Sequence, residues 1–196
     1  MPSEDRPRLF VAVLLPESVR ERIAGVAARL QPFRTNVSIV RKENFHVTLK
    51  FMGETDVSLL DRATGVIRSA AVAQAPFDAA ISGWGAFPNA RKARVVWAGV
   101  SDGAEQLRSL SRGVEKGLAA LGFEDENRFR PHVTIGRVRN PDRSGRLAEL
   151  LAEEIGPLGG FTVTDVHLMK STLAPGGALY ESLESFPLKD LRRPSG

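Results

Sequence analysis

Two short stretches of the chain repeat the tripeptide His-Val-Thr, and they contain two of its three histidines. The first is NFHVTLKFMGET over residues 44–55, and the second is RPHVTIGRV over residues 130–138. Polar and apolar residues alternate in both stretches, which predicts β-strands that each carry one polar face. A single histidine in a strand is most often structural, but a matched second copy in a chain so poor in histidine indicates paired chemistry.

The two polar faces carry the same pair of side chains. His46 and Thr48 share a face of the first strand, because residues two apart project to the same side. His132 and Thr134 do the same in the second strand. If these faces oppose across a cleft, one imidazole can be protonated while the other is neutral, since histidine titrates at about pH 6.5. Such a pair supplies a general acid and a general base to one substrate.

Phosphoryl transfer at a cyclic phosphodiester suits this arrangement. The attacking water and the leaving oxygen lie on opposite sides of the phosphorus, so an acid and a base should flank it. The hydroxyls of Thr48 and Thr134 can donate hydrogen bonds to the non-bridging oxygens, where negative charge must be stabilised.

Two basic residues beside the motifs are expected to bind the same phosphate. Lys50 follows Thr48 by two residues and projects from the same face in a regular strand. Arg137 would fall on the apolar face, but Gly136 before it offers a place for a β-bulge. We therefore predict an irregular pleat at Gly136 and an Arg137 side chain that reaches the phosphate. The third histidine, His167, lacks a following threonine and is expected to be structural.

The elements that must position these residues are a mixture of strands and helices. Apolar runs predict strands over 8–15, 37–40, 46–51, 76–84, 93–100, 131–138, 160–171 and 178–186, and helical spacing predicts helices over 19–30, 59–70, 107–121 and 147–155. Gly53 is expected to close the strand 46–51, and Thr55 or Asp56 to cap the helix after it.

The order of these elements predicts the fold class. Strands and helices do not alternate strictly, which favours an α+β fold with largely antiparallel sheets. The repeated motif predicts two lobes related by a pseudo-twofold axis, with the sheets lining a central cleft and the helices outside. No linker divides the chain, so residues 1–196 are expected to form a single bilobal domain.

Composition narrows the class of protein. With 42% hydrophobic residues in 196, the chain can build a core without metal or disulfide support. It has no cysteine, which excludes disulfides, thiol catalysis and cysteine-based zinc sites. The net charge of +4 favours a polyanionic ligand such as RNA or a nucleotide. No apolar run is long enough to span a membrane, and no signal peptide is recognised, so a cytoplasmic protein is expected, with a monomer as the default.

Several segments together resemble the 2H phosphoesterase superfamily, and more closely its RNA 2',3'-cyclic phosphodiesterase branch, also called 2'-5' RNA ligase. RLFVAVLLP, NFHVTLKFMGE, ARVVWAGV, RPHVTIGRV and STLAPGGALYESL are each similar to family segments and occur in the family's order. The last contains the pattern Ser-x-Leu-x-Pro-x-Gly-x-x-Tyr, which implies that Ser171 and Tyr180 lie in the cleft.

The resemblance implies a bilobal α+β fold and an activity that needs neither a metal nor another cofactor. It implies hydrolysis of an RNA 2',3'-cyclic phosphate to a 2'-phosphate. In that scheme His46 donates a proton to the departing 3' oxygen, and His132 accepts a proton from the attacking water. It also implies RNA ligation that forms a 2'-5' bond.

Other interpretations stay open at this point. His46, His132 and a carboxylate could hold a catalytic metal, although neither motif is His-x-His or His-Glu-x-x-His. The cleft could belong to a non-catalytic RNA-binding module, or to a phosphodiesterase acting on small cyclic nucleotides. An ATP-dependent ligase or kinase is disfavoured because the chain has no Gly-x-x-x-x-Gly-Lys-Ser/Thr loop.

Other conspicuous side chains are expected to have structural roles. The basic group Arg91, Lys92 and Arg94 is expected to be a solvated turn with at most a weak contact to an RNA backbone. Trp84, Trp97 and Phe129 are expected to be packing residues.

Overall fold

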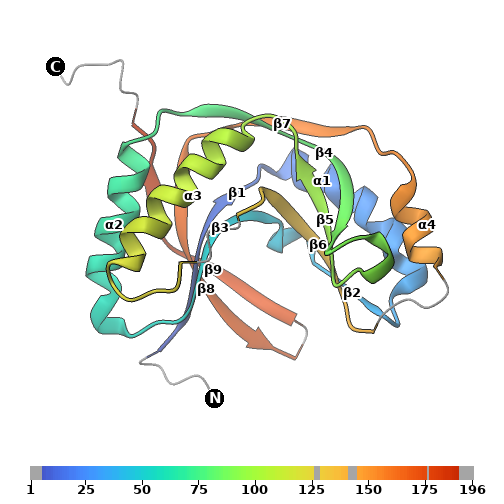
Figure 1. Cartoon of the computed structure of the whole chain (residues 1–196), viewed down its shortest axis with the longest axis horizontal. Helices are drawn as coiled ribbons and strands as arrows, with labels where there is room; N and C mark the ends of the chain where they lie inside the picture. The colour runs from blue at the N-terminus through green and yellow to red at the C-terminus, as the bar shows by residue number, and fades with distance from the viewer. Residues whose placement is uncertain (1–5, 126–128, 141–144, 176, 190–196) are drawn as a thin grey trace.

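The computed structural model describes residues 6–125, 129–140, 145–175 and 177–189 (Figure 1). Its helices are α1 (Glu17–Ala27), α2 (Leu60–Val72), α3 (Ala104–Ala119) and α4 (Arg146–Ala152), with short 3-10 turns η1 (Ala28–Phe33), η2 (Lys42–Asn44), η3 (Val57–Leu59) and η4 (Ala90–Lys92). Its strands are β1 (Arg8–Leu14), β2 (Val37–Ile39), β3 (His46–Glu54), β4 (Phe77–Phe87), β5 (Val95–Val100), β6 (His132–Val138), β7 (Pro157–Val163), β8 (Asp165–Ala174) and β9 (Gly177–Pro187).

The strands of the described chain form one sheet, curved across the molecule (Figure 1). Its order is β7-β4-β5-β6-β3-β1-β8-β9, and β2 pairs with β6 beside this path. All of the pairings are antiparallel. The α+β class and the antiparallel pairing are therefore confirmed. The two predicted lobes share a continuous sheet, joined where β3 meets β6.

The sheet divides at this junction into two halves. The His46 half contains β1, β3, β8 and β9, and it is covered by α2 and α3, which also pack against each other. The His132 half contains β2, β4, β5, β6 and β7, and it is covered by α1 and α4. The helix pairs lie at opposite ends of the sheet (Figure 1).

The chain crosses repeatedly between the two halves. Helix α1 follows β1 along the chain but contacts β6 and β7, and α3 follows β5 but contacts β3. Each half is thus covered in part by one helix whose preceding strand belongs to the other half. We infer that the chain folds as a single unit.

Burial of β1 on both faces explains why its sequence is an uninterrupted apolar run. Leu9, Val11 and Val13 belong to the main core under the helices, whereas Phe10 and Ala12 form a second buried cluster with Met169. A strand that is buried on both faces needs apolar residues at successive positions.

Two predicted boundaries are wrong. The strand expected over 160–171 is divided at Thr164, because β7 pairs with β4 in one half while β8 pairs with β1 and β9 in the other. Strand β3 continues to Glu54, since Gly53 adopts a positive φ of 71° within the strand rather than ending it. The predicted cap at Asp56 is confirmed, because its side chain accepts a hydrogen bond from the Ser58 amide at the start of η3, which leads directly into α2 at Leu60.

Candidate active site

The two His-Val-Thr motifs lie side by side at the junction of the two halves. Strands β3 and β6 are antiparallel, and Val47 is paired with Val133. In this register the residue before Val47 is opposite the residue after Val133, and the reverse also holds. His46 therefore lies across from Thr134, and Thr48 across from His132. The pseudo-twofold axis passes through the valine pair, and the four polar residues share one face of the sheet.

Both imidazoles are held by the same local contact. His46 Nδ1 is 2.8 Å from the carbonyl oxygen of Asn44, and His132 Nδ1 is 2.6 Å from the carbonyl oxygen of Arg130. A carbonyl only accepts hydrogen bonds, so each neutral ring donates from Nδ1 and keeps its lone pair on Nε2. His46 Nε2 is 2.9 Å from Thr48 Oγ1, whose hydroxyl donates to it. The nitrogen that can exchange a proton with substrate is therefore Nε2 in both rings.

A β-bulge follows the His-Val-Thr motif in each strand. In β3, Lys50 and Thr48 pair with the adjacent residues Val11 and Ala12, which leaves Leu49 as the extra residue. In β6, Gly136 and Thr134 pair with Val96 and Trp97, which leaves Ile135 as the extra residue. An inserted residue reverses which side chains face the cleft from that point on.

The β6 bulge brings Arg137 to the catalytic face. The predicted irregularity beside Gly136 is confirmed, since the register shift lies between Gly136 and Thr134. Arg137 lines the same cavity as Thr134, Thr48 and His46. Contact between its guanidinium and a phosphate stays a prediction.

The β3 bulge has the opposite consequence for Lys50. The prediction that Lys50 lies on the face of His46 is wrong, because the extra Leu49 turns the side chain towards α3. Lys50 is buried, and its Nζ is 3.1 Å from Glu115 Oε1 and also donates to the Glu124 carbonyl. The cleft position that alternation assigned to Lys50 is taken by Phe51, which lines the cavity with His46 and Thr48.

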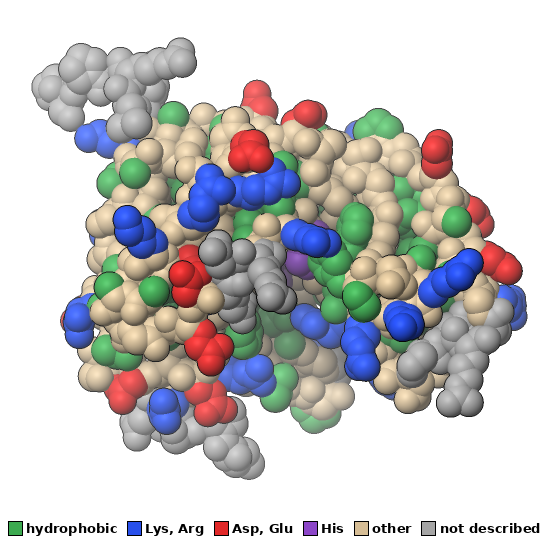
Figure 2. Space-filling view, viewed as in Figure 1, with side chains coloured by type: hydrophobic (Ala, Val, Ile, Leu, Met, Phe, Trp, Pro, Cys, Tyr) green, Lys and Arg blue, Asp and Glu red, His purple; other side chains and the backbone are tan. Residues whose placement is uncertain are grey.

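The catalytic pocket, as we call this cavity, has a volume of about 80 Å³ and is lined by Phe10, Val40, Asn44, His46, Thr48, Phe51, Thr134, Arg137, Ser171 and Tyr180. It has room for a compact group rather than for a whole nucleotide. His132 lines an adjoining cavity of about 210 Å³ that shares Thr48 and Phe51 with the catalytic pocket. In the space-filling view a histidine is visible at the centre of this face, with Lys and Arg side chains around it (Figure 2).

Ser171 and Tyr180 enter the pocket from the β8–β9 hairpin, where they are directly paired. The Tyr180 ring makes an edge contact with His46, with 5.3 Å between ring centroids. Phe10 lies 4.9 Å from His46 and 5.0 Å from Tyr180 by the same measure. Asn44 Nδ2 donates to the Ala178 carbonyl at 2.8 Å and so fastens the hairpin beside His46.

Aromatic residues also enclose the second histidine. The Phe87 ring makes an edge contact with His132 at 5.0 Å, and Trp97 lies 5.4 Å from Phe87. The Arg130 guanidinium lies over Phe87, 5.8 Å from the ring centroid. Trp97 thus packs beside the catalytic face. Sequence reasoning did not single out Phe10, Asn44, Phe51 or Phe87, because nothing local distinguishes them from other strand and turn residues.

The electrostatic surroundings favour neutral imidazoles in the unliganded site. Burial lowers the pKa of His46 to about 4, and the nearby His132 and Arg137 act in the same direction, against the opposing hydrogen bond to Asn44. Burial also lowers the pKa of His132 below its usual value, with Arg137 contributing and the bond to Arg130 opposing. Both rings are thus uncharged at neutral pH before a substrate enters.

The remaining sequence expectations concern residues outside this face. His167 Nδ1 lies 2.9 Å from Ser182 Oγ, and its Nε2 lies 3.4 Å from Asp165. The indole nitrogen of Trp84 donates to the Glu153 carbonyl at 2.8 Å. Arg91 and Lys92 are exposed within η4. Among the described residues, no three His, Asp or Glu side chains gather where they could hold a metal ion.

These features define a class of protein, with two pseudo-symmetric histidine–threonine pairs set on one face of a curved antiparallel sheet for acid–base chemistry. The family model of the 2'-5' RNA ligase superfamily matches residues 38–174. The chain therefore belongs to the 2'-5' RNA ligase superfamily.

Individual relatives agree with this assignment along nearly the whole chain. The RNA 2',3'-cyclic phosphodiesterase of Methanothermobacter thermautotrophicus is 37% identical over 182 residues, which cover 92% of this chain and 98% of that protein. The structure of TT0787 from Thermus thermophilus superposes with a TM-score of 0.78 at 30% identity, covering 94% of this chain and all of that one. The structure of E. coli LigT superposes with a TM-score of 0.75 at 25% identity, covering 95% of this chain and all of that one.

Proposed function

We propose that this protein hydrolyses RNA 2',3'-cyclic phosphates and leaves a 2'-phosphate. The observation that carries the proposal is the pairing of Val47 with Val133, which brings the two histidine–threonine pairs side by side. His46 and both threonines line one small pocket with Arg137, and His132 lines the adjoining cavity. Relatives that are named RNA 2',3'-cyclic phosphodiesterase support it, including the archaeal protein described above. The net charge of +4 is compatible with an RNA substrate.

The chemistry follows from the two available Nε2 atoms. Neutral His132 accepts a proton from water as the water oxygen attacks the phosphorus. The bond from phosphorus to the 3' oxygen breaks, and protonated His46 donates its proton to that oxygen. The products are a 2'-phosphomonoester and a free 3' hydroxyl. Proton exchange with solvent then restores both rings. The division of roles between the histidines follows the family resemblance.

The charge that develops on the phosphate is met by three groups. Thr134 can donate a hydroxyl hydrogen bond to a non-bridging oxygen, and Thr48 can do the same once protonation of His46 Nε2 releases its hydroxyl proton. Arg137 supplies a permanent positive charge. The bound phosphate in turn acts on His46. Its negative charge raises the pKa of this enclosed imidazole from about 4, so the proton-donating form is favoured once substrate is bound. A 5' hydroxyl in place of water would give 2'-5' ligation with the same residues.

The test is hydrolysis of an oligoribonucleotide that ends in 2',3'-cyclic phosphate, measured in EDTA. We expect the wild-type protein to produce a 2'-phosphate end, and His46→Ala and His132→Ala each to lose about 10²- to 10⁴-fold in rate. Abolition of wild-type activity by EDTA would show a metal mechanism instead. Tight RNA binding without turnover by the folded wild-type protein would show a binding module. Turnover of small cyclic nucleotides alone would show a different substrate class.

Two further properties belong to this proposal. We infer that the protein acts in the cytoplasm and as a monomer, and gel filtration with light scattering tests the second point. Within the described ranges, no helix is long and apolar enough to cross a membrane.

A further inference from the structure

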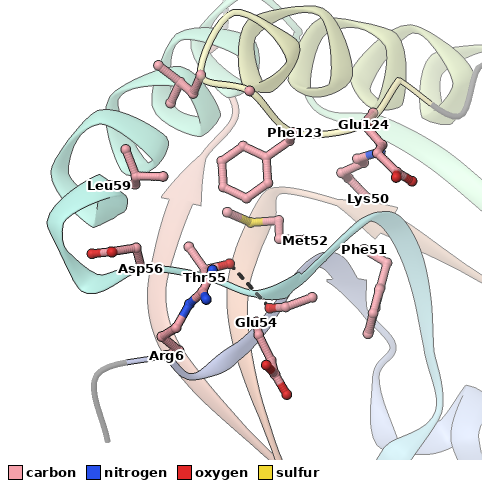
Figure 3. Close-up of a pocket in the computed structure, with 13 residues that line it drawn as sticks. Arg6, Lys50, Phe51, Met52, Glu54, Thr55, Asp56, Leu59, Phe123 and Glu124 are labelled. Carbon is pink, nitrogen blue, oxygen red and sulfur yellow. Dashed lines mark hydrogen bonds between the residues drawn. The ribbon is translucent and has the colours of Figure 1, made fainter. Parts of the chain in front are cut away.

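A second, larger cavity lies beyond the catalytic pocket at the far end of β3. It has a volume of about 430 Å³ and lies between the segment 50–59 and the loop 121–124 that follows α3 (Figure 3). We call it the outer pocket and define it by Met52, Thr55, Leu59, Leu121 and Phe123. Its volume is within the range of about 300–1,000 Å³ that small-molecule sites occupy.

The interior of the outer pocket is apolar. Phe123, Met52 and Leu59 project towards one another across it, while the Glu54 carboxylate points away (Figure 3). The Thr55 hydroxyl already donates to the Gly53 carbonyl at 3.2 Å. A partly exposed aromatic ring on an apolar floor suits a flat, neutral group.

The charges around the outer pocket do not suit a phosphate. Of its two cationic residues, Lys50 is held by Glu115 and by the Glu124 carbonyl, which leaves Arg6. Glu54 and Asp56 also line the cavity, so negative charge predominates at its rim. This differs from the catalytic pocket, where Arg137 faces the histidines.

A chain of shared residues connects the two pockets. The cavity of about 210 Å³ beside His132 shares Thr48 and Phe51 with the catalytic pocket, and it shares Lys50 and Phe51 with the outer pocket. Phe51 therefore borders all three cavities. Along this path the order is catalytic pocket, middle cavity and outer pocket.

One wall of the outer pocket, the loop 121–124, is held in place by contacts with Lys50. Lys50 Nζ is anchored by Glu115 on α3 and also holds the Glu124 carbonyl, so the loop 121–124 is tied to β3. The lysine that alternation assigned to the phosphate thus shapes this neighbouring cavity instead. A pre-formed wall lowers the entropy cost of binding a ligand there.

The chemistry of the substrate determines which part of the RNA can reach the outer pocket. An RNA whose last phosphate is cyclic has further nucleotides only on its 5' side. With that phosphate in the catalytic pocket, the RNA chain runs in its 5' direction past Phe51, which borders all three cavities, and the base before the terminal nucleoside reaches the outer pocket. We propose that the outer pocket binds the penultimate nucleobase of the RNA by stacking on Phe123, so that the enzyme prefers oligonucleotides to cyclic mononucleotides. This inference rests on the proposed function.

The test compares three substrates: a trinucleotide ending in 2',3'-cyclic phosphate, the same trinucleotide with its penultimate base removed, and adenosine 2',3'-cyclic phosphate. We expect the wild-type protein to show kcat/KM about 5- to 100-fold higher for the intact trinucleotide than for the base-free one, as stacking on an aromatic side chain provides. Phe123→Ala should reduce this ratio to near one, and Phe123→Tyr should retain it.

Phe161→Ala is the matched control, because Phe161 on β7 is also a partly buried phenylalanine packed on the core but lies in the other half. It should keep the wild-type ratio. Unfolding midpoints of all variants show whether they are folded. The inference is overturned if the wild-type protein does not distinguish the two trinucleotides, or if Phe123→Ala lowers kcat/KM equally for all three substrates. Failure of the wild-type protein to turn over any of the three would instead refute the proposed function.

Discussion

The two halves of the sheet place the same motif in different surroundings. In each half a histidine begins the strand, donates from Nδ1 to the carbonyl two residues earlier, and is followed by a threonine and a bulge. Beyond the bulge the halves diverge. Phe51 takes the cleft position in the His46 half, and Arg137 takes it in the His132 half. One half thus provides an aromatic surface and the other provides the cation.

The residue that the bulge turns inward also differs. Lys50 points at α3, where Glu115 receives it. The equivalent residue in the other half is Gly136, and a Cβ there would meet Val37 at 3.0 Å and Leu30 at 3.2 Å. Val37 of β2 and Leu30 of η1 pack so closely here that a side chain at this position would have to displace them, whereas α3 supplies a buried acid to Lys50. The two halves therefore share a backbone pattern, but residues at equivalent positions in it have different roles.

The largest expected effect concerns the buried ion pair of the His46 half, which has no counterpart among the described residues of the His132 half. Lys50→Met removes a cation that pairs with the buried Glu115 carboxylate, and breaking such a pair from one side costs about 3–5 kcal/mol. We expect this loss in the free energy of unfolding measured with denaturant. The double variant Lys50→Met/Glu115→Leu should recover much of it, because no buried charge is then left unpaired. If Lys50→Met is as stable as the wild-type protein, the buried ion pair does not distinguish the two halves.

The next effect concerns Arg137, the cation that the His132 half contributes to the described lining of the catalytic pocket. Arg137→Met should lower kcat by about 10²- to 10³-fold, because it removes a fixed positive charge from the developing phosphate charge. Phe51→Leu is the matched change at the equivalent position of the other half, and it should cost much less in kcat. Single-turnover rates on an RNA 2',3'-cyclic phosphate measure both. Equal losses would remove the distinction between the two cleft positions.

The pH dependence of stability should also differ between the two histidines. The folded pKa of His46, about 4, lies below the unfolded value of about 6.5, so the folded state binds fewer protons between these values. Its contribution is complete above about pH 6.5 and is lost as the pH falls towards 4, by up to about 3 kcal/mol. We expect His46→Asn to reduce this acid-dependent loss more than His132→Asn does. Denaturant unfolding at several pH values is the measurement, and indistinguishable profiles for wild type and His46→Asn would refute it.

The smallest effect concerns the support of the β3 bulge. Ser111 on α3 is buried, and its hydroxyl donates to the carbonyl of the extra residue Leu49 at 2.8 Å. Ser111→Ala should reduce the free energy of unfolding by about 1 kcal/mol. The matched control is Ser69→Ala, because the exposed Ser69 hydroxyl bonds the Gly65 carbonyl within α2 at 2.8 Å. A loss at Ser69 as large as that at Ser111 would show that the bulge contact has no special role.

Particular residues show where prediction from the sequence succeeds. The histidine–threonine pairs follow from an alternation of period two, which only neighbouring residues determine. The irregularity beside Gly136 was accessible for the same reason, since a glycine in a strand marks a place where a bulge is tolerated. The side-chain direction of Lys50 was predicted wrongly because no glycine marks the bulge at Leu49. That bulge depends on pairing with β1 and on the hydrogen bond from Ser111 of α3.

The sequence by itself therefore determined the class of fold, the two strands that carry the His-Val-Thr motifs and the pair of imidazoles, all of which follow from the spacing and order of residues along the chain. Only the tertiary structure decided that the strands meet at Val47 and Val133, that Lys50 is kept out of the catalytic pocket, and that β7 and β8 part at Thr164. The physical reason is that strand register, bulges and side-chain direction are set by partners distant in the chain. A one-residue insertion in a strand reverses every face beyond it.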